Sequence, residues 1–170
     1  MNHIVWYRRR WVAASLFGLA FAVPFFAALA AMETCAASAP HDRIAQSAKT
    51  HHIAFQVNSD DPVAMKHAIT NSLNALKNYG GKGEPAAIEI VAYGPGVHMF
   101  RADTSPVKDL LQFLHTNYPD VRFSVCGNTK MIMEKNEGHP LALVDGAQVV
   151  PFGVVRLVEL QEAGWTYLRP

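Results

Sequence analysis

Strand and helix patterns alternate along the chain from His51 onwards, and this alternation restricts the possible folds more than any other feature. The segment HHIAFQV has the composition of a strand. Asp61 and Pro62 then supply an N-cap and a first position for a helix in which apolar residues recur at helical spacing. Further strands are predicted over residues 86–93, 121–125, 147–151 and 165–168 (the last a strand or an extended tail), and further helices over 105–116, 128–135 and 153–163.

Strands and helices in this order form βαβ units, whose right-handed crossovers give a parallel sheet with helices on both faces. The sequence therefore predicts a single α/β domain over residues 51–170. We expect three α/β/α layers around a mostly parallel five-stranded sheet. No internal repeat or low-complexity block divides this region.

The first 31 residues have the order of charges and apolar residues that is typical of a secretory signal peptide. Arg8 to Arg10 precede a long apolar run, and Ala28-Leu29-Ala30 fits an A-x-A cleavage site. The alternative is a membrane anchor, because the run from Trp11 to Ala31 is just long enough to span a bilayer. A proline within the run and small residues at its end favour cleavage. Residues 32–50 are small, polar and aperiodic, and they are predicted to form a flexible linker.

This leader predicts a periplasmic or secreted protein that meets the membrane only if the leader stays uncleaved. Removal of residues 1–30 takes away three arginines, so Lys plus Arg falls from 15 to 12 against 14 acidic residues. The net charge then becomes about −2. No basic patch and no basic–aromatic interleaving remains, so nucleic acid is excluded as an expected partner.

Cys126 lies at the carboxyl end of the third predicted strand, directly before a predicted helix. In open parallel sheets, ligands gather beyond the carboxyl ends of the strands. At the start of a helix, unpaired N–H groups and the helix dipole favour a thiolate over a thiol. We therefore expect Cys126 to be a nucleophile that faces a polar, glycine-bordered crevice.

The residues around these strand ends are the candidate ligand-binding residues. Gly127 leaves room for a substrate sulfur to approach, and Asn128 or Thr129 either caps the helix or donates a hydrogen bond to a bound anion. The segment Gly-Pro-Gly after the second strand is predicted to form a tight turn, since the other glycines of a nucleotide fingerprint are absent. The full candidate set is Asn58, Gly94, Gly96, Gly127, Asn128 and Thr129.

Other readings of Cys126 stay open. Free cysteine often acts as a small buried apolar residue, and a disulfide with Cys35 in the predicted linker is a further alternative. Met131 and Met133 near a thiol are ligand types for copper(I), but methionines on a short helix usually fill gaps in the core. We therefore predict no metal site and no cofactor.

Arg156 is predicted to be solvated or at an interface, with pairing to a carboxylate or an anion as the alternative.

Four segments of the chain resemble the DsrE-like family of small sulfur-relay proteins, and in particular its exported, poorly characterised members. They are FQVNSDDPVAMKHAITNSLNAL, IEIVAYGPGVHMF, VRFSVCGNTKMIM and VPFGVVRLVELQEAGWTYLRP, within residues 51–170. The resemblance implies a flavodoxin-like three-layer fold and assembly into trimers or hexamers. In the family's sulfurtransferases, a cysteine near this strand end carries a persulfide, a role that the resemblance assigns here to Cys126.

Together, these features predict an exported protein that binds or transfers sulfane sulfur through Cys126, with a sulfur donor or acceptor protein as its partner. The alternative is a non-enzymatic module with a buried Cys126, either a small-ligand-binding domain or a structural subunit of an oligomer. In the oligomer, the apolar segment VVPFGVV would lie in an interface between copies.

Overall fold

The computed structural model describes residues 49–170. Within this range the chain forms, in order, β1 (His51–Val57), α1 (Pro62–Gly80), β2 (Ala86–Ala92), the 3-10 helix η1 (Gly94–Phe100), α2 (Lys108–Asn117), β3 (Val121–Cys126), α3 (Gly127–Glu137), β4 (Ala147–Val150), α4 (Gly153–Glu162) and β5 (Thr166–Leu168). The predicted leader and nearly all of the predicted linker lie outside the described residues.

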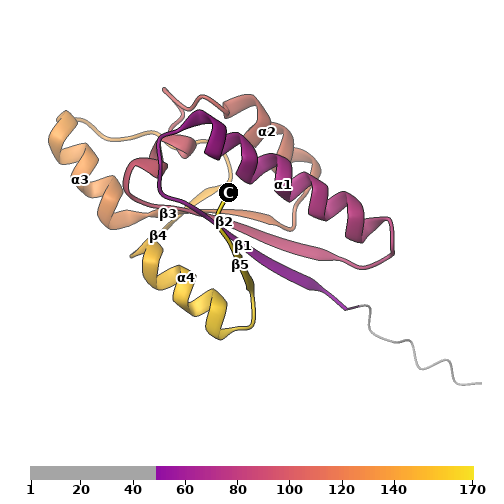
Figure 1. Cartoon of the computed structure of the whole chain (residues 1–170). Helices are drawn as coiled ribbons and strands as arrows, with labels where there is room; N and C mark the ends of the chain where they lie inside the picture. The colour runs from indigo at the N-terminus through magenta and orange to yellow at the C-terminus, as the bar shows by residue number, and fades with distance from the viewer. Residues whose placement is uncertain (1–48) are drawn as a thin grey trace, which may run out of the picture. The chain divides into compact units, whose positions relative to one another are not determined.

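The strands form one sheet in the order β4-β3-β2-β1-β5, and every neighbouring pair is parallel. The first four strands lie side by side in chain order. The chain then crosses from β4 at one edge to β5 at the other, where β5 pairs with β1 (Figure 1). The prediction of a three-layer α/β/α, flavodoxin-like fold is confirmed.

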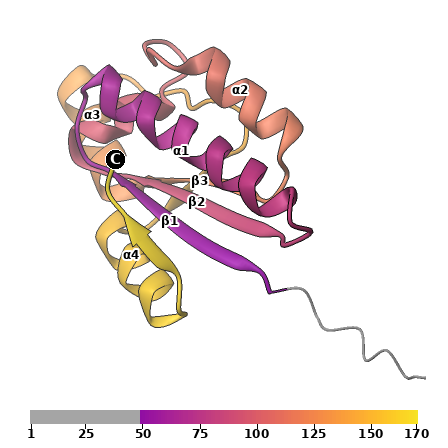
Figure 2. The ribbon, with the colours of Figure 1, turned by 45° about the vertical axis from the view of Figure 1, so that its right-hand side comes forward.

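The two faces of the sheet are covered unequally. Helices α1 and α2 pack on one face, whereas α4 packs on the other (Figure 2). The larger core lies under α1 and α2 and contains Phe55, Phe100 and Phe123. The core under α4 is small, with Leu157 and Leu160 as its larger buried side chains. No helix in residues 49–170 is long and apolar enough to cross a bilayer.

The start of α1 follows the prediction, because Asp61 accepts a hydrogen bond at 2.9 Å from the N–H of Val63 and Pro62 occupies the first helical turn. Two other local predictions are wrong. The Gly-Pro-Gly segment opens η1 instead of closing a tight turn. Helix α2 begins later than predicted, since the hydroxyl of Ser105 donates back to the carbonyl of Met99 and holds the preceding residues in a turn.

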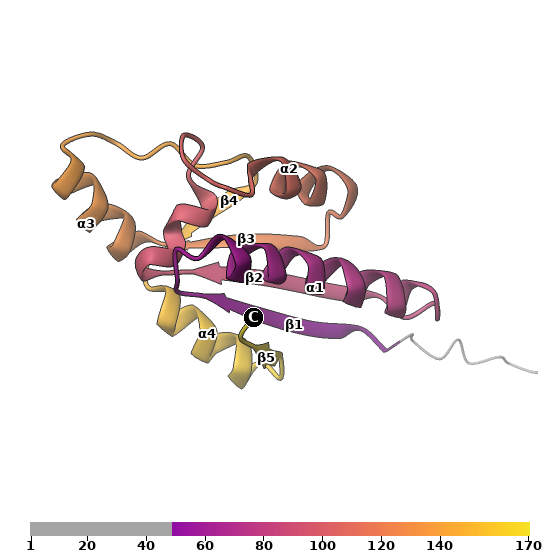
Figure 3. The same ribbon diagram turned by 45° about the horizontal axis from the view of Figure 1, so that its top comes forward.

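Helix α3 extends beyond the carboxyl ends of β2 and β3 (Figure 3) and has no buried residue. Its far end is held by Glu137, which accepts hydrogen bonds from Nη1 and Nη2 of Arg101 at 2.6 and 2.9 Å. Arg101 is itself buried and also pairs with Asp103. A helix without buried residues is therefore fixed at its start by β3 and at its end by an ion pair.

Candidate functional site

Cys126 is the last residue of β3 and the N-cap of α3. Its side chain lies on the α4 face of the sheet, because Ser124, two residues earlier, lies on that face and side chains alternate along a strand. Cys126 is 5 % exposed, so the thiol does not face the open crevice that the sequence predicts. It does lie at the start of a helix, as predicted.

The first residue of α4 packs directly against Cys126. A Cβ atom at Gly153 would lie 3.2 Å from Cβ of Cys126 and 3.0 Å from Cβ of Tyr93. Glycine is therefore needed here for the close approach of α4 to the sheet. Gly153 is not among the predicted site residues, although a glycine at the first position of a predicted helix was a signal for it. The thiol is thus situated between the starts of α3 and α4.

The pKa of the Cys126 thiol reflects two opposing effects. Burial raises the pKa, because a charge is disfavoured away from water. Hydrogen bonding from the Thr129 hydroxyl, and then from the N–H groups of Gly153, Thr129 and Asn128, lowers it. These donors outweigh the burial, so the pKa lies below that of an ordinary thiol. Both helix starts thus favour the thiolate.

Thr129 connects Cys126 to the end of the neighbouring strand. The N–H of Gly94 donates a hydrogen bond to Oγ1 of Thr129 at 3.0 Å. Because this oxygen accepts from Gly94, its own hydrogen is free to point towards the sulfur, where it lowers the pKa of Cys126. Gly94 and Thr129 are therefore brought together as the sequence predicts, but they act on the cysteine itself.

The remaining predicted ligand residues are dispersed. A Cβ atom at Gly127 would lie 3.0 Å from Cγ1 of Val149, so β4 fills the space that was expected to admit a substrate sulfur. A Cβ atom at Gly96 would lie 2.1 Å from the carbonyl oxygen of Val57, so Gly96 lets η1 approach β1. Asn58 lines a separate hollow at the ends of β1 and β5.

The N–H of Asn128 donates to the carbonyl of Pro151 at 3.2 Å and so also ties α3 to the segment before α4. The sequence also offers His139, in a Gly-His-Pro loop, as a base for Cys126, but the structure places it too far away. It follows the end of α3, where its Nε2 lies 3.5 Å from Glu137. Cys126 precedes that helix of 11 residues, which separates the two ends by about 16 Å.

Within residues 49–170, no three His, Cys, Asp or Glu side chains come together as a metal site.

An ion pair between the buried Glu89 and the half-buried Arg156 fixes the first turn of α4 to the sheet. Glu89 in β2 is 1 % exposed and accepts hydrogen bonds from Nε and Nη2 of Arg156 at 2.7 and 2.8 Å. The hydroxyl of Ser124 donates a third, at 2.6 Å. Burial raises the pKa of Glu89, but these hydrogen bonds and the charge of Arg156 outweigh it and lower the pKa. Arg156 thus adopts the predicted alternative, pairing with a carboxylate.

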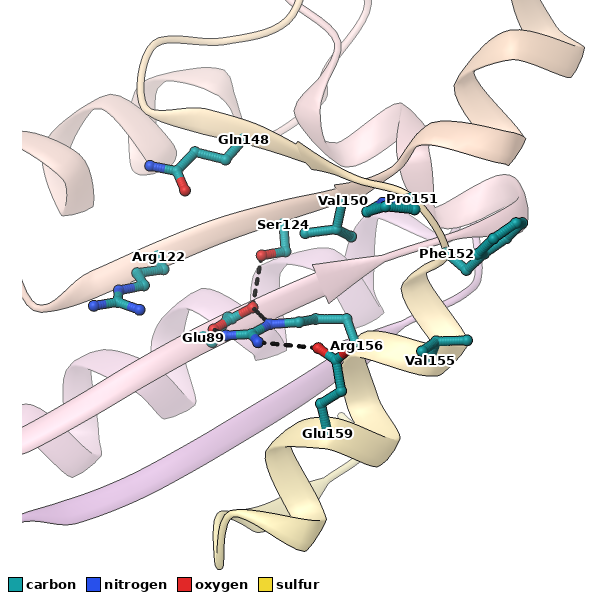
Figure 4. Close-up of a pocket in the computed structure, with 10 residues that line it drawn as sticks. All are labelled: Glu89, Arg122, Ser124, Gln148, Val150, Pro151, Phe152, Val155, Arg156 and Glu159. Carbon is teal, nitrogen blue, oxygen red and sulfur yellow. Dashed lines mark hydrogen bonds and ion pairs between the residues drawn. The ribbon is translucent and has the colours of Figure 1, made fainter.

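This ion pair forms the middle of a groove of about 220 Å³ between α4 and the strands β3 and β4. Figure 4 shows Arg122 and Gln148 at one end of the groove and Phe152 and Val155 at the other. This groove is not predicted by the sequence. The available signal was Glu89, a single charged residue within the apolar strand AAIEIVA.

The fold and the site define the class of this protein. It is a three-layer α/β/α protein with a parallel sheet, in which a cysteine at the carboxyl end of a strand lies between the starts of two helices. The DsrE/DsrF-like family matches residues 27–170, and the chain belongs to this family, as its sequence resemblance predicted. A similar solved structure is that of MTH1491 from Methanobacterium thermoautotrophicum, a protein of unknown function. It is 31 % identical with a TM-score of 0.60, over 71 % of this chain and 99 % of that chain. No curated protein matches the chain.

Proposed function

We propose that this protein binds or transfers sulfane sulfur through Cys126. The observation that carries the proposal is the position of Cys126, which is the N-cap of α3 and packs against Gly153 at the start of α4. There the Thr129 hydroxyl and the N–H groups of both helix starts lower the pKa of the thiol. Donors that lower the pKa of a buried thiol increase the share of it that is present as the nucleophilic thiolate. Membership of the DsrE/DsrF-like family, a group with a sulfur-relay-type fold, supports the same chemistry.

In the proposed step, the Cys126 thiolate attacks the outer sulfur of a persulfide, R–S–SH. A new S–S bond forms to Cys126, the S–S bond of the donor breaks, and the donor leaves as the thiolate R–S⁻. Since Cys126 is only 5 % exposed, a small donor such as polysulfide suits the site for loading. Once loaded, the sulfane sulfur lies about 2 Å beyond the cysteine sulfur, which brings it within closer reach of an acceptor.

The test uses the Cys35→Ser variant, in which Cys126 is the only thiol of the chain. After exposure to polysulfide, mass spectrometry of the intact protein and its peptides should show added sulfur on the peptide that contains Cys126. The matched control also carries Cys126→Ser and should remain unmodified. A chain that stays unmodified, with a thiol that alkylates only at the pH of an ordinary cysteine, would contradict the proposal.

We infer that the mature protein is exported and that its partners are sulfur donor or acceptor proteins. The inference rests on the leader sequence, with Arg8 to Arg10 before an apolar run. Cell fractionation followed by mass measurement of the native protein tests it. A periplasmic or secreted product that has lost about the first 30 residues is expected. A full-length chain in the membrane fraction would favour the anchor instead.

A second candidate function is a structural subunit of a homo-oligomer, a trimer or a hexamer. It is favoured by exposed apolar side chains on β4, on α4 and at the N-cap of α4, which are Val149, Phe152, Val154, Val155 and Val158. In this candidate, Cys126 serves only for packing, so Cys126→Ala would leave the protein's cellular role intact. Light scattering of the wild type and of Val154→Glu tests the surface, because a charge in a self-associating interface should shift the protein towards monomers.

A further inference from the structure

We propose that the groove beside the Glu89–Arg156 pair is a binding site for a small carboxylic acid that carries an apolar group. The groove has a polar end and an apolar end, and the neutralised ion pair lies between them (Figure 4). Its volume of about 220 Å³ is below the roughly 300–1,000 Å³ that is typical for drug-sized ligands, so it fits a metabolite-sized molecule.

The polar end has an available cation. Arg122 lies opposite Glu89 in the register of β2 and β3. Glu89 already accepts hydrogen bonds from Arg156 and Ser124, and within residues 49–170 Arg122 forms no ion pair and no side-chain hydrogen bond. The charge of Arg122 contributes to the lowered pKa of Glu89, but its guanidinium is not hydrogen-bonded to a carboxylate. It therefore matches the planar, two-oxygen geometry of a ligand carboxylate. Gln148 lies at the same end and adds an amide donor.

The apolar end has side chains that gain from being covered. Phe152 is 53 % exposed and Val155 is 46 % exposed, and both line the groove with Val150 and Pro151. Burial of such surface by a ring or an aliphatic chain is favourable, at about 25 cal/mol per Å² of apolar area. The apolar part of the ligand therefore binds here, and its carboxylate extends to Arg122.

The charges between the two ends restrict the ligand to one negative charge. Glu89 is neutralised by Arg156, and Arg156 also contacts Glu159 at 3.2 Å. A second anionic group on the ligand would approach these carboxylates without a free cation to meet it. A monocarboxylate is therefore preferred over a dicarboxylate or a phosphate ester.

The site is distinct from the thiol. Cys126 does not line the groove, and it lies two residues beyond Ser124, about 7 Å along the strand. The proposal therefore does not depend on sulfur transfer by Cys126, and Cys126→Ser is expected to leave ligand affinity unchanged.

The test measures binding of 4-phenylbutyrate to the full chain by calorimetry and ligand-observed NMR. Two comparison probes separate the ends of the site: 4-phenylbutyramide lacks the charge, and butyrate lacks the ring. We expect 4-phenylbutyrate to bind at least about tenfold more tightly than either. Arg122→Gln and Gln148→Glu should each weaken it by about tenfold or more, the second because a new carboxylate would occupy the guanidinium.

The matched control is Arg169→Gln, which removes the same charge from a different hollow and should leave binding unchanged. Circular dichroism of each variant checks that the fold is retained. The proposal would be overturned by equal binding of the acid and its amide, or by an equal loss in Arg169→Gln and Arg122→Gln. Absence of binding at about 10 mM ligand would also overturn it.

Discussion

Replacement of Arg156 by methionine is expected to reduce the free energy of unfolding by about 3–5 kcal/mol. Methionine keeps much of the length of the side chain and its contact with the sheet, but it removes the guanidinium. The perturbation therefore isolates the buried ion pair that joins the first turn of α4 to β2.

The size of this loss in the free energy of unfolding follows from the environment of Glu89. Its carboxylate is 1 % exposed and accepts hydrogen bonds from two nitrogens of Arg156, at 2.7 and 2.8 Å. In the variant, Ser124 remains as its hydrogen-bond donor, at 2.6 Å. A buried carboxylate that loses its countercharge cannot move to water, so it carries most of the desolvation cost. Replacement of both partners, as Glu89→Leu with Arg156→Met, should recover most of the loss.

The pH dependence tests the same reasoning. In the wild type the pKa of Glu89 is lowered, so its stabilising contribution is present above the ordinary carboxylate pKa and is lost as the pH falls through the folded pKa. Without Arg156, burial instead raises the pKa of Glu89, and the ionised carboxylate opposes folding at neutral pH. The difference in stability between wild type and variant should therefore be largest near neutral pH and narrow as the pH is lowered.

Urea denaturation followed by circular dichroism at several pH values gives these free energies. The matched control is Arg122→Met, which removes an exposed arginine on the other side of Glu89. It should change stability by about 0.5 kcal/mol or less. If Arg156→Met reduces the free energy of unfolding no more than Arg122→Met does, or by the same amount at every pH, then the Glu89–Arg156 pair does not hold α4 on the sheet.

Three further predictions concern single residues. Thr129→Val should raise the pKa of the Cys126 thiol, because the substitution removes the hydroxyl donor. The pH profile of iodoacetamide alkylation should therefore move to higher pH, whereas Thr129→Ser keeps a hydroxyl and should show the wild-type profile. Gly96→Ala should destabilise the protein by more than about 2 kcal/mol in thermal or urea unfolding, since its Cβ would lie 2.1 Å from the carbonyl oxygen of Val57. Gly80→Ala, at a helical position with no atom within 4 Å of the added Cβ, should instead stabilise it by about 0.4–1 kcal/mol in the same assay.

The sequence was sufficient for the elements and for the class of fold, because local signals define both. The N-cap Asp61 with Pro62 sets the start of α1, and mainly apolar runs identify the inner strands, although β2 carries Glu89 and β3 carries Arg122. The start of α2 was misplaced for a physical reason. Ser105 carries the composition of a helix cap, but its hydroxyl bonds back to Met99, a tertiary contact that composition cannot show.

The candidate site was predicted only where its members are close in sequence. Cys126 and Thr129 fall at the start of one helix, and the relation between them follows from that spacing. Gly153 and the Glu89–Arg156 pair depend on contacts between residues far apart in the chain, the pair being separated by 67 positions. A charge within an apolar strand indicates that a partner exists, but the identity of that partner depends on where the last helix crosses the sheet.

The order of the strands explains why these features share one face. Each step from β1 to β4 moves to the next neighbour in the same direction, and such steps with a common handedness place α1 and α2 on the same face, while α3 extends beyond the ends of the strands. The only step to reverse direction within residues 49–170 is from β4 to β5, and its helix α4 therefore covers the opposite face alone. One helix cannot cover five strands, so this face keeps polar side chains, an ion pair and a groove beside α4. The same crossover brings the start of α4 to the end of β3, where the N–H of Gly153 helps to lower the pKa of Cys126 below that of an ordinary thiol. The contribution of α4 to the electrostatics of the thiol is thus a consequence of the sheet topology, whereas that of Thr129 and α3 follows from the local sequence.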